Sequence, residues 1–132
     1  MKRIPEILGE ARTIAVVGLS AKRSRPSHGV AEYLQHAGYR VIPVNPNIAE
    51  ALGEKSYATL DQVPDEIDIV DIFRRPEHVP EIVEAAIRKG AKTVWMQEGV
   101  VHEEAARRAE SAGLSVVMDR CILKDHRRLG LK

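Results

Sequence analysis

The chain has 132 residues, 44% of them hydrophobic, and 20 Lys and Arg stand against 19 Asp and Glu, which gives a net charge of +1. This length predicts a single domain over residues 1–132 with a hydrophobic core, and the balanced charge argues against a nucleic-acid partner. No apolar run approaches the 18 residues of a membrane span and no signal-peptide pattern is present, so we expect a cytoplasmic protein without a membrane partner.

The first elements expected are a helix, a strand and a second helix. Residues 4–11 form a short amphipathic helix within a lead-in segment, 1–12. Residues 13–19 are apolar throughout, and a strand without alternation is typical of a parallel sheet that is covered on both faces. A helix over 27–37 follows, with Pro26 at its start, because apolar residues recur there at helical spacing.

The middle of the chain is less regular. A second strand is expected over 40–45, and Pro43 within it predicts an edge position or a bulge, because proline donates no hydrogen bond to a neighbouring strand. Residues 46–66 show only turns and two short helical turns. A third strand follows over 67–72, where Asp68 and Asp71 cannot share a face, so they form no carboxylate pair and at least one must find donors within the fold.

The last third of the chain alternates again between helix and strand. Helices are expected over 76–89 and 102–112, strands over 93–97 and 114–118, and a short basic tail over 122–132. Five strands that alternate with helices predict an α/β fold: a doubly wound open sheet of five parallel strands with helices on both faces. The expected strand order is 3-2-1-4-5, which places the ligand site at the carboxyl edge, between the first and fourth strands.

The residues that follow each strand are therefore the candidate site residues. They are Gly18 to Ser27 after the first strand, Asn45 and Pro46 after the second, Phe73 to Pro76 after the third, Gln97 to Gly99 after the fourth, and Asp119 to Cys121 after the fifth. After Gly18 the next glycine is Gly29, so neither a dinucleotide fingerprint nor a Walker A loop is present. Asn45 stands where an NAD site usually has an acidic residue, which disfavours NAD without excluding it.

Five cations belong to two of these loops. Lys22, Arg23 and Arg25 follow the first strand, and Arg74 and Arg75 follow the third. Such a rim suits a ligand that carries several phosphates, because arginine binds phosphate through two parallel hydrogen bonds. The plainer alternative is a solvated basic edge.

Several short motifs carry a family resemblance. They are Val17-Gly-Leu-Ser20, Arg25-Pro-Ser27, the stretch from Tyr39 to Pro46, Phe73-Arg-Arg-Pro76 and Trp95-Met-Gln-Glu-Gly99. In this order and spacing, over about residues 10–123, they resemble the small bacterial CoA-binding proteins, which are similar to the N-terminal domain of the succinyl-CoA synthetase α subunit. The resemblance implies a Rossmann-like fold that holds coenzyme A across the carboxyl ends of the strands.

The resemblance also implies roles for individual residues. Gly18, Leu19 and Ser20 match the turn that meets the phosphates, and Gln97 replaces the threonine of the synthetase's Thr-Glu-Gly turn. The full set of expected cofactor-binding residues is Gly18, Leu19, Ser20, Lys22, Arg25, Pro26, Ser27, Asn45, Pro46, Phe73, Arg74, Gln97 and Gly99. No metal site is expected, because no cluster of His, Cys and Asp residues has ligand spacing.

The expected function is the binding of coenzyme A or an acyl-CoA by a stand-alone module. The synthetase's phosphohistidine belongs to a second domain with no counterpart in this sequence, and the five histidines here are scattered, so no catalytic residue is assigned. Two alternatives stay open. One is a small NAD(P)-dependent or CoA-thiol-dependent enzyme that uses Cys121, whose plainer role is that of a small buried hydrophobe. The other is a regulatory subunit with a vestigial nucleotide site and an unidentified protein partner.

Overall fold

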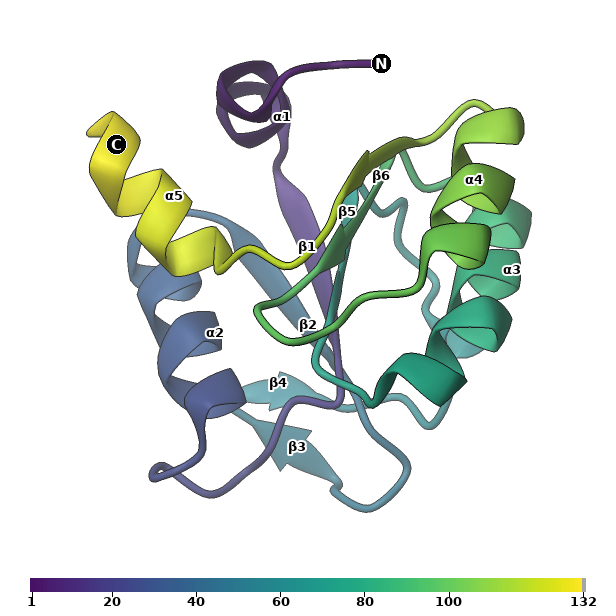
Figure 1. The fold of residues 1–132 in the computed structure, drawn as a ribbon. Helices are drawn as coiled ribbons and strands as arrows, with labels where there is room; N and C mark the ends of the chain where they lie inside the picture. The colour runs from purple at the N-terminus through teal and green to yellow at the C-terminus, as the bar shows by residue number, and fades with distance from the viewer. Residues whose placement is uncertain (132) are drawn as a thin grey trace.

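A parallel five-stranded sheet runs through the middle of the molecule (Figure 1). The computed structural model describes residues 1–131. Each of the five strands falls within a predicted strand and pairs in parallel with its neighbours, which confirms the doubly wound α/β class. The strands are β1 (Thr13–Val17), β2 (Arg40–Val44), β5 (Ile69–Ile72), β6 (Thr93–Met96) and β7 (Ser115–Val117).

Helices cover both faces of this sheet. On one face lie α1 (Ile4–Glu10), α2 (Pro26–His36) and α5 (Ile122–Leu129). On the other face lie α3 (Val79–Lys89), α4 (Glu103–Ser111) and the 3-10 turn η1 (Leu60–Gln62). A second 3-10 turn, η2 (Pro76–His78), forms the start of the predicted helix 76–89, and a small antiparallel pair, β3 (Glu50–Ala51) and β4 (Glu54–Lys55), interrupts the irregular segment. The predicted tail is largely α5, and residue 132 lies outside the described residues.

The strand order differs from the predicted 3-2-1-4-5. The order is β2-β1-β5-β6-β7, so the third strand of this sheet, β5, lies between the first and the fourth and not at the edge beside β2. The connection from β2 to β5 explains the difference, because Leu60 and Val63 pack on the face opposite to α2. A right-handed crossover on the opposite face carries the chain back past β1. The switch point therefore lies between β1 and β5.

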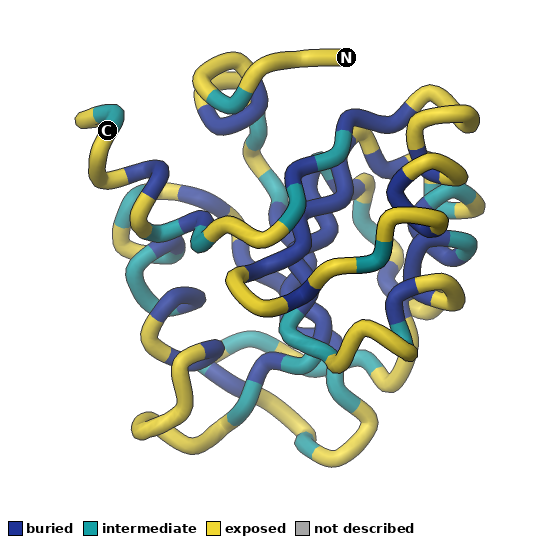
Figure 2. Tube along the Cα trace, viewed as in Figure 1, coloured by how far each residue is buried: buried dark blue, intermediate teal, exposed yellow. Residues whose placement is uncertain are grey.

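The strands are buried on both faces, as their continuous apolar sequence predicts (Figure 2). Ala15 and Val17 point into the cluster under α3 and α4, whereas Ile14 and Val16 point into the cluster under α1, α2 and α5. Trp95 is fully buried, so it belongs to the core as a strand residue should. Within residues 1–131, no helix has the length and apolarity needed to cross a bilayer.

Pro43 occupies an edge strand, which confirms one of the two expectations for it. It pairs in register with Val16 of β1, and its carbonyl accepts a hydrogen bond from the Tyr57 N–H on the outer side (3.1 Å). Because the nitrogen and carbonyl of one strand residue point to the same side, the nitrogen of Pro43 also faces outward. The missing N–H therefore removes no hydrogen bond to β1.

The two aspartates near β5 have opposite environments. Asp68 accepts hydrogen bonds from the backbone N–H groups of Arg12 (2.8 Å) and Thr13 (3.0 Å) and pairs with Lys92, so it finds the donors that the sequence demands. Asp71 is fully buried, and neither of its carboxyl oxygens has a hydrogen-bond partner within residues 1–131. Burial raises the pKa of Asp71 well above its ordinary value, so this carboxyl is neutral over a wider pH range.

Candidate ligand site at the carboxyl edge

The turn after β1 is pressed against the segment after β5. Gly18 has φ of +91°, and its N–H donates to the Val44 carbonyl (2.9 Å). A Cβ at this position would lie 2.4 Å from the Phe73 carbonyl oxygen and 3.0 Å from Cδ of Arg74. Only glycine fits both the backbone angle and this approach. The structure thus brings the predicted residues Gly18, Phe73 and Arg74 together at the switch point.

The loop from Leu19 to Ser27 is held by short polar contacts. The Ser27 hydroxyl accepts a hydrogen bond from the Ser20 N–H (3.0 Å), and the Ser20 hydroxyl accepts one from the Lys22 N–H (3.1 Å). Arg25 precedes α2, and Pro26 occupies its first turn. The loop therefore lies beside the positive end of the dipole of α2, an arrangement that favours an anion.

The end of β2 is fixed by Asn45. Its side-chain N–H donates to the Leu19 carbonyl (2.9 Å), and its side-chain oxygen accepts from the Asn47 N–H (2.9 Å). An aspartate could accept but not donate, so it could not hold both turns. Asn45 thus joins the loops that follow β1 and β2, a role for which the sequence gives no signal beyond the residue type.

The five predicted rim cations are unpaired. Within residues 1–131, none of Lys22, Arg23, Arg25, Arg74 and Arg75 forms an ion pair with a carboxylate, and all but Arg74, which is partly buried, are exposed. Their positive charge is therefore available to an anionic ligand at this edge.

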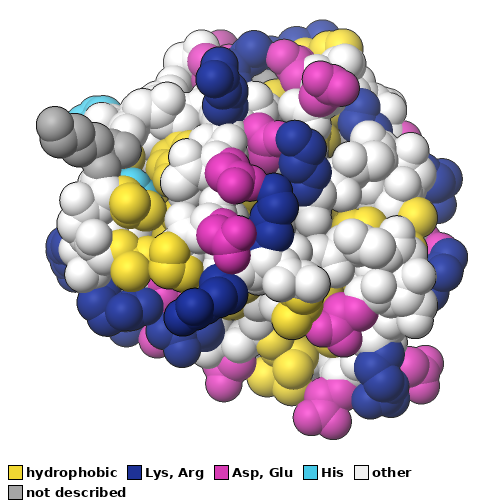
Figure 3. Space-filling view, turned by 90° about the horizontal axis from the view of Figure 1, so that it is seen from above, with side chains coloured by type: hydrophobic (Ala, Val, Ile, Leu, Met, Phe, Trp, Pro, Cys, Tyr) yellow, Lys and Arg dark blue, Asp and Glu magenta, His cyan; other side chains and the backbone are white. Residues whose placement is uncertain are grey.

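The opposite edge of the sheet has a different charge pattern. Figure 3 looks onto this amino edge and shows Lys and Arg side chains interspersed with Asp and Glu. Ion pairs there include Lys2–Glu10, Arg40–Asp65 (2.9 Å) and Lys92–Asp68 (3.5 Å). In the part of the chain that the structure describes, the carboxyl edge thus combines the switch point with a group of unpaired cations.

A cavity of about 260 Å³ adjoins the Gly18 turn on the α3 side of the sheet. The ends of β1 and β2 contribute Val17 and Val44, and Arg74 borders it. The remaining lining residues come from the irregular segment and α3: Pro46, Ala58, Thr59, Leu60, Asp61, Glu81, Ile82, Ala85 and Arg88. Apart from Pro46, the sequence did not predict these residues as part of the site. Residues 58–61 belong to the segment 46–66, which has no periodicity that would place it, and the α3 residues lie in a predicted helix that was not assigned to the site.

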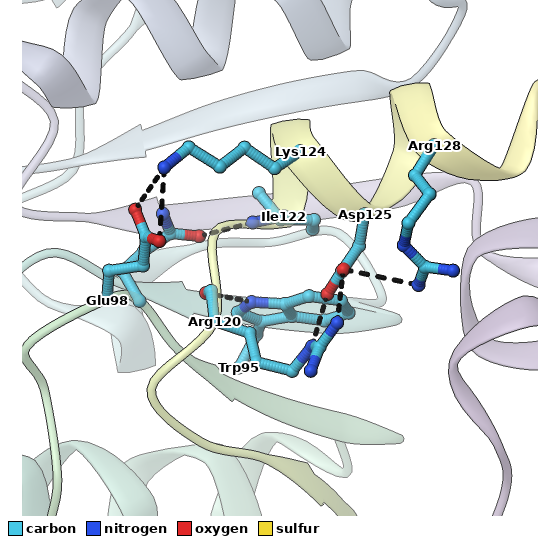
Figure 4. Close-up of polar contacts among 8 residues, drawn as sticks. Trp95, Glu98, Arg120, Ile122, Lys124, Asp125 and Arg128 are labelled. Atoms are coloured by element: carbon cyan, nitrogen blue, oxygen red, sulfur yellow. Dashed lines mark hydrogen bonds and ion pairs between the residues drawn. The ribbon is translucent and has the colours of Figure 1, made fainter.

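The loop after β6 is tied to the start of α5 (Figure 4). The Gln97 side chain is buried, and its oxygen accepts a hydrogen bond from the N–H of Ile122, the first residue of α5 (3.0 Å). Both carboxylate oxygens of Glu98 lie 3.1 Å from the Lys124 ammonium, and the Gly99 N–H donates to Asp119 (2.8 Å). Gln97 thus has a partner within the chain that the sequence did not predict.

The same junction contains a nearly buried carboxylate. Asp125 receives two hydrogen bonds from Arg120, both 2.7 Å long, and a longer one from Arg128 (3.4 Å). These hydrogen bonds, that of Arg120 above all, lower the pKa of Asp125. Cys121 precedes α5 and is partly buried against the hydrophobic cluster of that face, in the environment of a small hydrophobe.

Comparison with known proteins shows which family this chain belongs to. The sequence profile of the family described as "CoA binding domain" matches residues 12–127. The uncharacterized protein YneT of Bacillus subtilis is 46% identical over 123 residues, which cover 93% of this chain and 91% of that protein. An ADP-forming acetate–CoA ligase of Archaeoglobus fulgidus is 30% identical over 101 residues, which cover 75% of this chain and only 15% of the ligase.

The fold is also found in solved structures. A hypothetical protein of Pyrococcus horikoshii has a TM-score of 0.93 and 45% sequence identity, and the match covers 96% of this chain and 89% of that one. This similarity extends over nearly the whole length of both chains, whereas the match to the ligase covers only a small part of the ligase.

Proposed function

The chain belongs to the family of CoA-binding domains, and we propose that it binds coenzyme A, free or acylated, at the carboxyl edge of its sheet as a module that acts without a catalytic domain of its own. The observation that carries this proposal is the group of unpaired cations around the Gly18 turn, at the switch point between β1 and β5. Coenzyme A carries three phosphate groups, which need such a group of cations.

The phosphates would lie against the loop from Gly18 to Ser27. The amino end of α2 follows this loop, Arg25 directly precedes the helix, and the Arg74 side chain lies beside Gly18, so all three could contribute to phosphate binding. The cavity beside it is lined largely by apolar side chains, such as Val17, Val44 and Leu60, and it suits the adenine ring. Arg74 borders both places, so it is the residue best positioned to bind a phosphate next to the ring.

The arm of the ligand would run along the ends of β5 and β6. Gly18 follows β1, and Gly99 follows β6, two strands away in the sheet. Two strand spacings amount to about 10 Å, which the long flexible arm of coenzyme A can bridge. Pro46 and the loop 97–99 would then contact different parts of one extended ligand.

The comparison with the ligases bears on whether the chain only binds its ligand or also catalyses a reaction. The chain matches only 15% of the length of the Archaeoglobus ligase, so the activity of that whole protein does not transfer to it. Cys121 is partly buried against the hydrophobic cluster under α1, α2 and α5, and within residues 1–131 no hydrogen bond joins it to a histidine. We therefore assign the carboxyl edge to ligand binding alone.

Titration calorimetry with single-site variants tests the proposal. Arg25→Ala and Arg74→Ala should each weaken coenzyme A binding by roughly 10- to 100-fold, the value of a charge-assisted hydrogen bond to phosphate. Arg107→Ala is the matched control, because Arg107 is an exposed arginine on α4, away from this edge. Absence of coenzyme A binding to the native protein, or equal affinities for all three variants, would overturn the proposal.

A further inference from the structure

A histidine is buried where α5 packs against α1 and α2. His126 is 1% exposed, and α5 lies along α2 with its far end near α1 (Figure 1). Its Nδ1 atom lies 2.8 Å from the Tyr33 hydroxyl. The rings of Tyr33 and Tyr39 stand edge-on to the imidazole, with distances of 5.4 and 5.6 Å between the ring centroids. The other nitrogen, Nε2, is buried and has no hydrogen-bond partner within residues 1–131.

Among residues 1–131, no carboxylate forms an ion pair or hydrogen bond with this imidazole. Tyr33 of α2 and Tyr39, just before β2, face it with neutral phenol rings. On α1, the Leu8 carbonyl accepts a hydrogen bond from the Tyr39 hydroxyl. On α5 itself, the carboxylate of Asp125 is engaged by Arg120 and Arg128. Burial lowers the pKa of His126, in agreement with these neutral surroundings.

We propose that α5 is a proton-sensitive latch: neutral His126 holds it on α1 and α2, and protonation of His126 releases it. In the neutral ring, Nδ1 is hydrogen-bonded to Tyr33 and Nε2 has no hydrogen-bond partner among residues 1–131. The imidazolium needs acceptors for two N–H groups and carries a charge, and the cluster supplies one acceptor and no opposite charge. Release of α5 exposes the ring to water, where both needs are met.

Proton linkage sets the pH range and the size of the effect. A free histidine takes up its proton near pH 6.5, whereas docked His126 does so only at lower pH. The docked state is therefore favoured in full above pH 6.5 and loses its advantage as the pH falls. Between these two pKa values, the ratio of released to docked α5 rises about tenfold for each pH unit of acidification.

The latch also reaches the carboxyl edge, and this consequence rests on the proposed function. The first turn of α5 is bonded to Gln97 through Ile122 and to Glu98 through Lys124, and both partners belong to the loop after β6. Release of α5 breaks these contacts and frees that loop. Affinity for coenzyme A should then fall in the same pH range in which α5 is released.

Hydrogen exchange at a series of pH values tests the latch without any ligand. Protection factors of the α5 amides, referred to those of α3, should fall as the pH is lowered below 6.5 in the native protein, by up to about tenfold for each pH unit. In His126→Phe, which keeps an aromatic ring between Tyr33 and Tyr39, the ratio should not change over this range. His36→Gln removes an exposed histidine at the end of α2 and should behave like the native protein.

Two results would overturn the latch: a ratio of α5 to α3 protection that is independent of pH in the native protein, or the same pH dependence in His126→Phe. If His126→Phe does not fold, titration of the His126 ring resonance decides, because an ordinary pKa near 6.5 in the docked state contradicts the proposal. A native protein that releases α5 on acidification but never binds coenzyme A would support the latch and refute the proposed function alone.

Discussion

Gly18 is constrained by its backbone angle and by a neighbouring strand at the same time. A side chain there meets a φ of +91° and a carbonyl oxygen 2.4 Å from its Cβ. The contact is with Phe73, so a substitution at Gly18 pushes apart the two loops that form the switch point. At the residue scale, this glycine is what allows the predicted site residues of β1 and β5 to meet.

Gly18→Ala should therefore lower the free energy of unfolding by about 2 kcal/mol or more, from the strained angle and the clash together. Gly29→Ala is the matched control, since Gly29 lies in α2 and a Cβ there meets nothing within 4 Å. That change should stabilise the protein by about 0.5–1 kcal/mol, because alanine is the better helix former. Urea unfolding of both variants measures the difference, and equal stabilities would contradict this account of Gly18.

Asp71 should lower the free energy of unfolding in a way that depends on pH. Its carboxyl is buried without a partner, and the unfolded chain releases its proton near the ordinary pKa of 3.8, whereas the folded chain retains it to higher pH. The free energy of unfolding therefore falls as the pH rises above about 4.

Asp71→Val should be more stable than the native protein, and the difference should grow between pH 4 and pH 8. Valine is an apolar residue that has no polar oxygens to bury, and it suits a buried strand. Denaturant midpoints at the two pH values measure the effect, and Asp71→Asn serves as the control that removes the ionisation but keeps a polar group. A valine variant that is less stable than the native protein at pH 8 would show that Asp71 has a partner in solution.

At the scale of elements, Gln97 joins the loop after β6 to the start of α5. The sequence resemblance matches Gln97 to a threonine of the synthetase family, and the Gln97 side-chain oxygen accepts a hydrogen bond from the Ile122 N–H at the start of α5. Threonine is shorter and could not reach that group from the end of β6. The glutamine thus accompanies a C-terminal helix that packs back onto the sheet.

Gln97→Thr should loosen the first turn of α5 and lower the free energy of unfolding by about 1–3 kcal/mol, the cost of a buried N–H without an acceptor. Hydrogen exchange of the Ile122 amide reports this directly, with the α3 amides as the internal reference. Unchanged protection at Ile122 would mean that water or another group takes the place of the Gln97 oxygen.

The sequence predicts the elements well and their order in the sheet less well. Apolar runs locate all five strands, because strands covered on both faces need continuous hydrophobic residues. The position of β5 depends on which face the chain crosses after β2, and residues 46–66 lack the helical periodicity that would reveal that face. For the same reason, Leu60 and its neighbours were not predicted to line the cavity.

For the site residues, the sequence predicts their positions but not their hydrogen-bond partners. Position after a strand predicts that Gly18, Asn45, Arg74 and Gln97 lie at one edge, since the carboxyl ends of parallel strands share it. The partners of Asn45 and Gln97 are distant in sequence and depend on the packing of loops against each other. Side-chain patterns along one segment contain no signal for such contacts.

At the scale of the whole molecule, charge is distributed unevenly over a nearly neutral chain. Several ion pairs lie at the amino edge, whereas within residues 1–131 five cations have no carboxylate partner at the carboxyl edge, beside the switch point and the start of α2. Unpaired like charges in one place repel each other, so their grouping is a cost that an anionic ligand removes. This cost, beside an apolar cavity, is the physical basis of the proposed function.

A crystal structure of the protein with coenzyme A tests the central claim most directly. We predict the diphosphate against the loop from Gly18 to Ser27, with Arg25 or Arg74 within 3.2 Å of a phosphate oxygen, the adenine in the cavity beside Val17 and Val44, and the arm directed toward Gly99. Coenzyme A bound only elsewhere, or absent from crystals grown at a saturating concentration, would contradict the account.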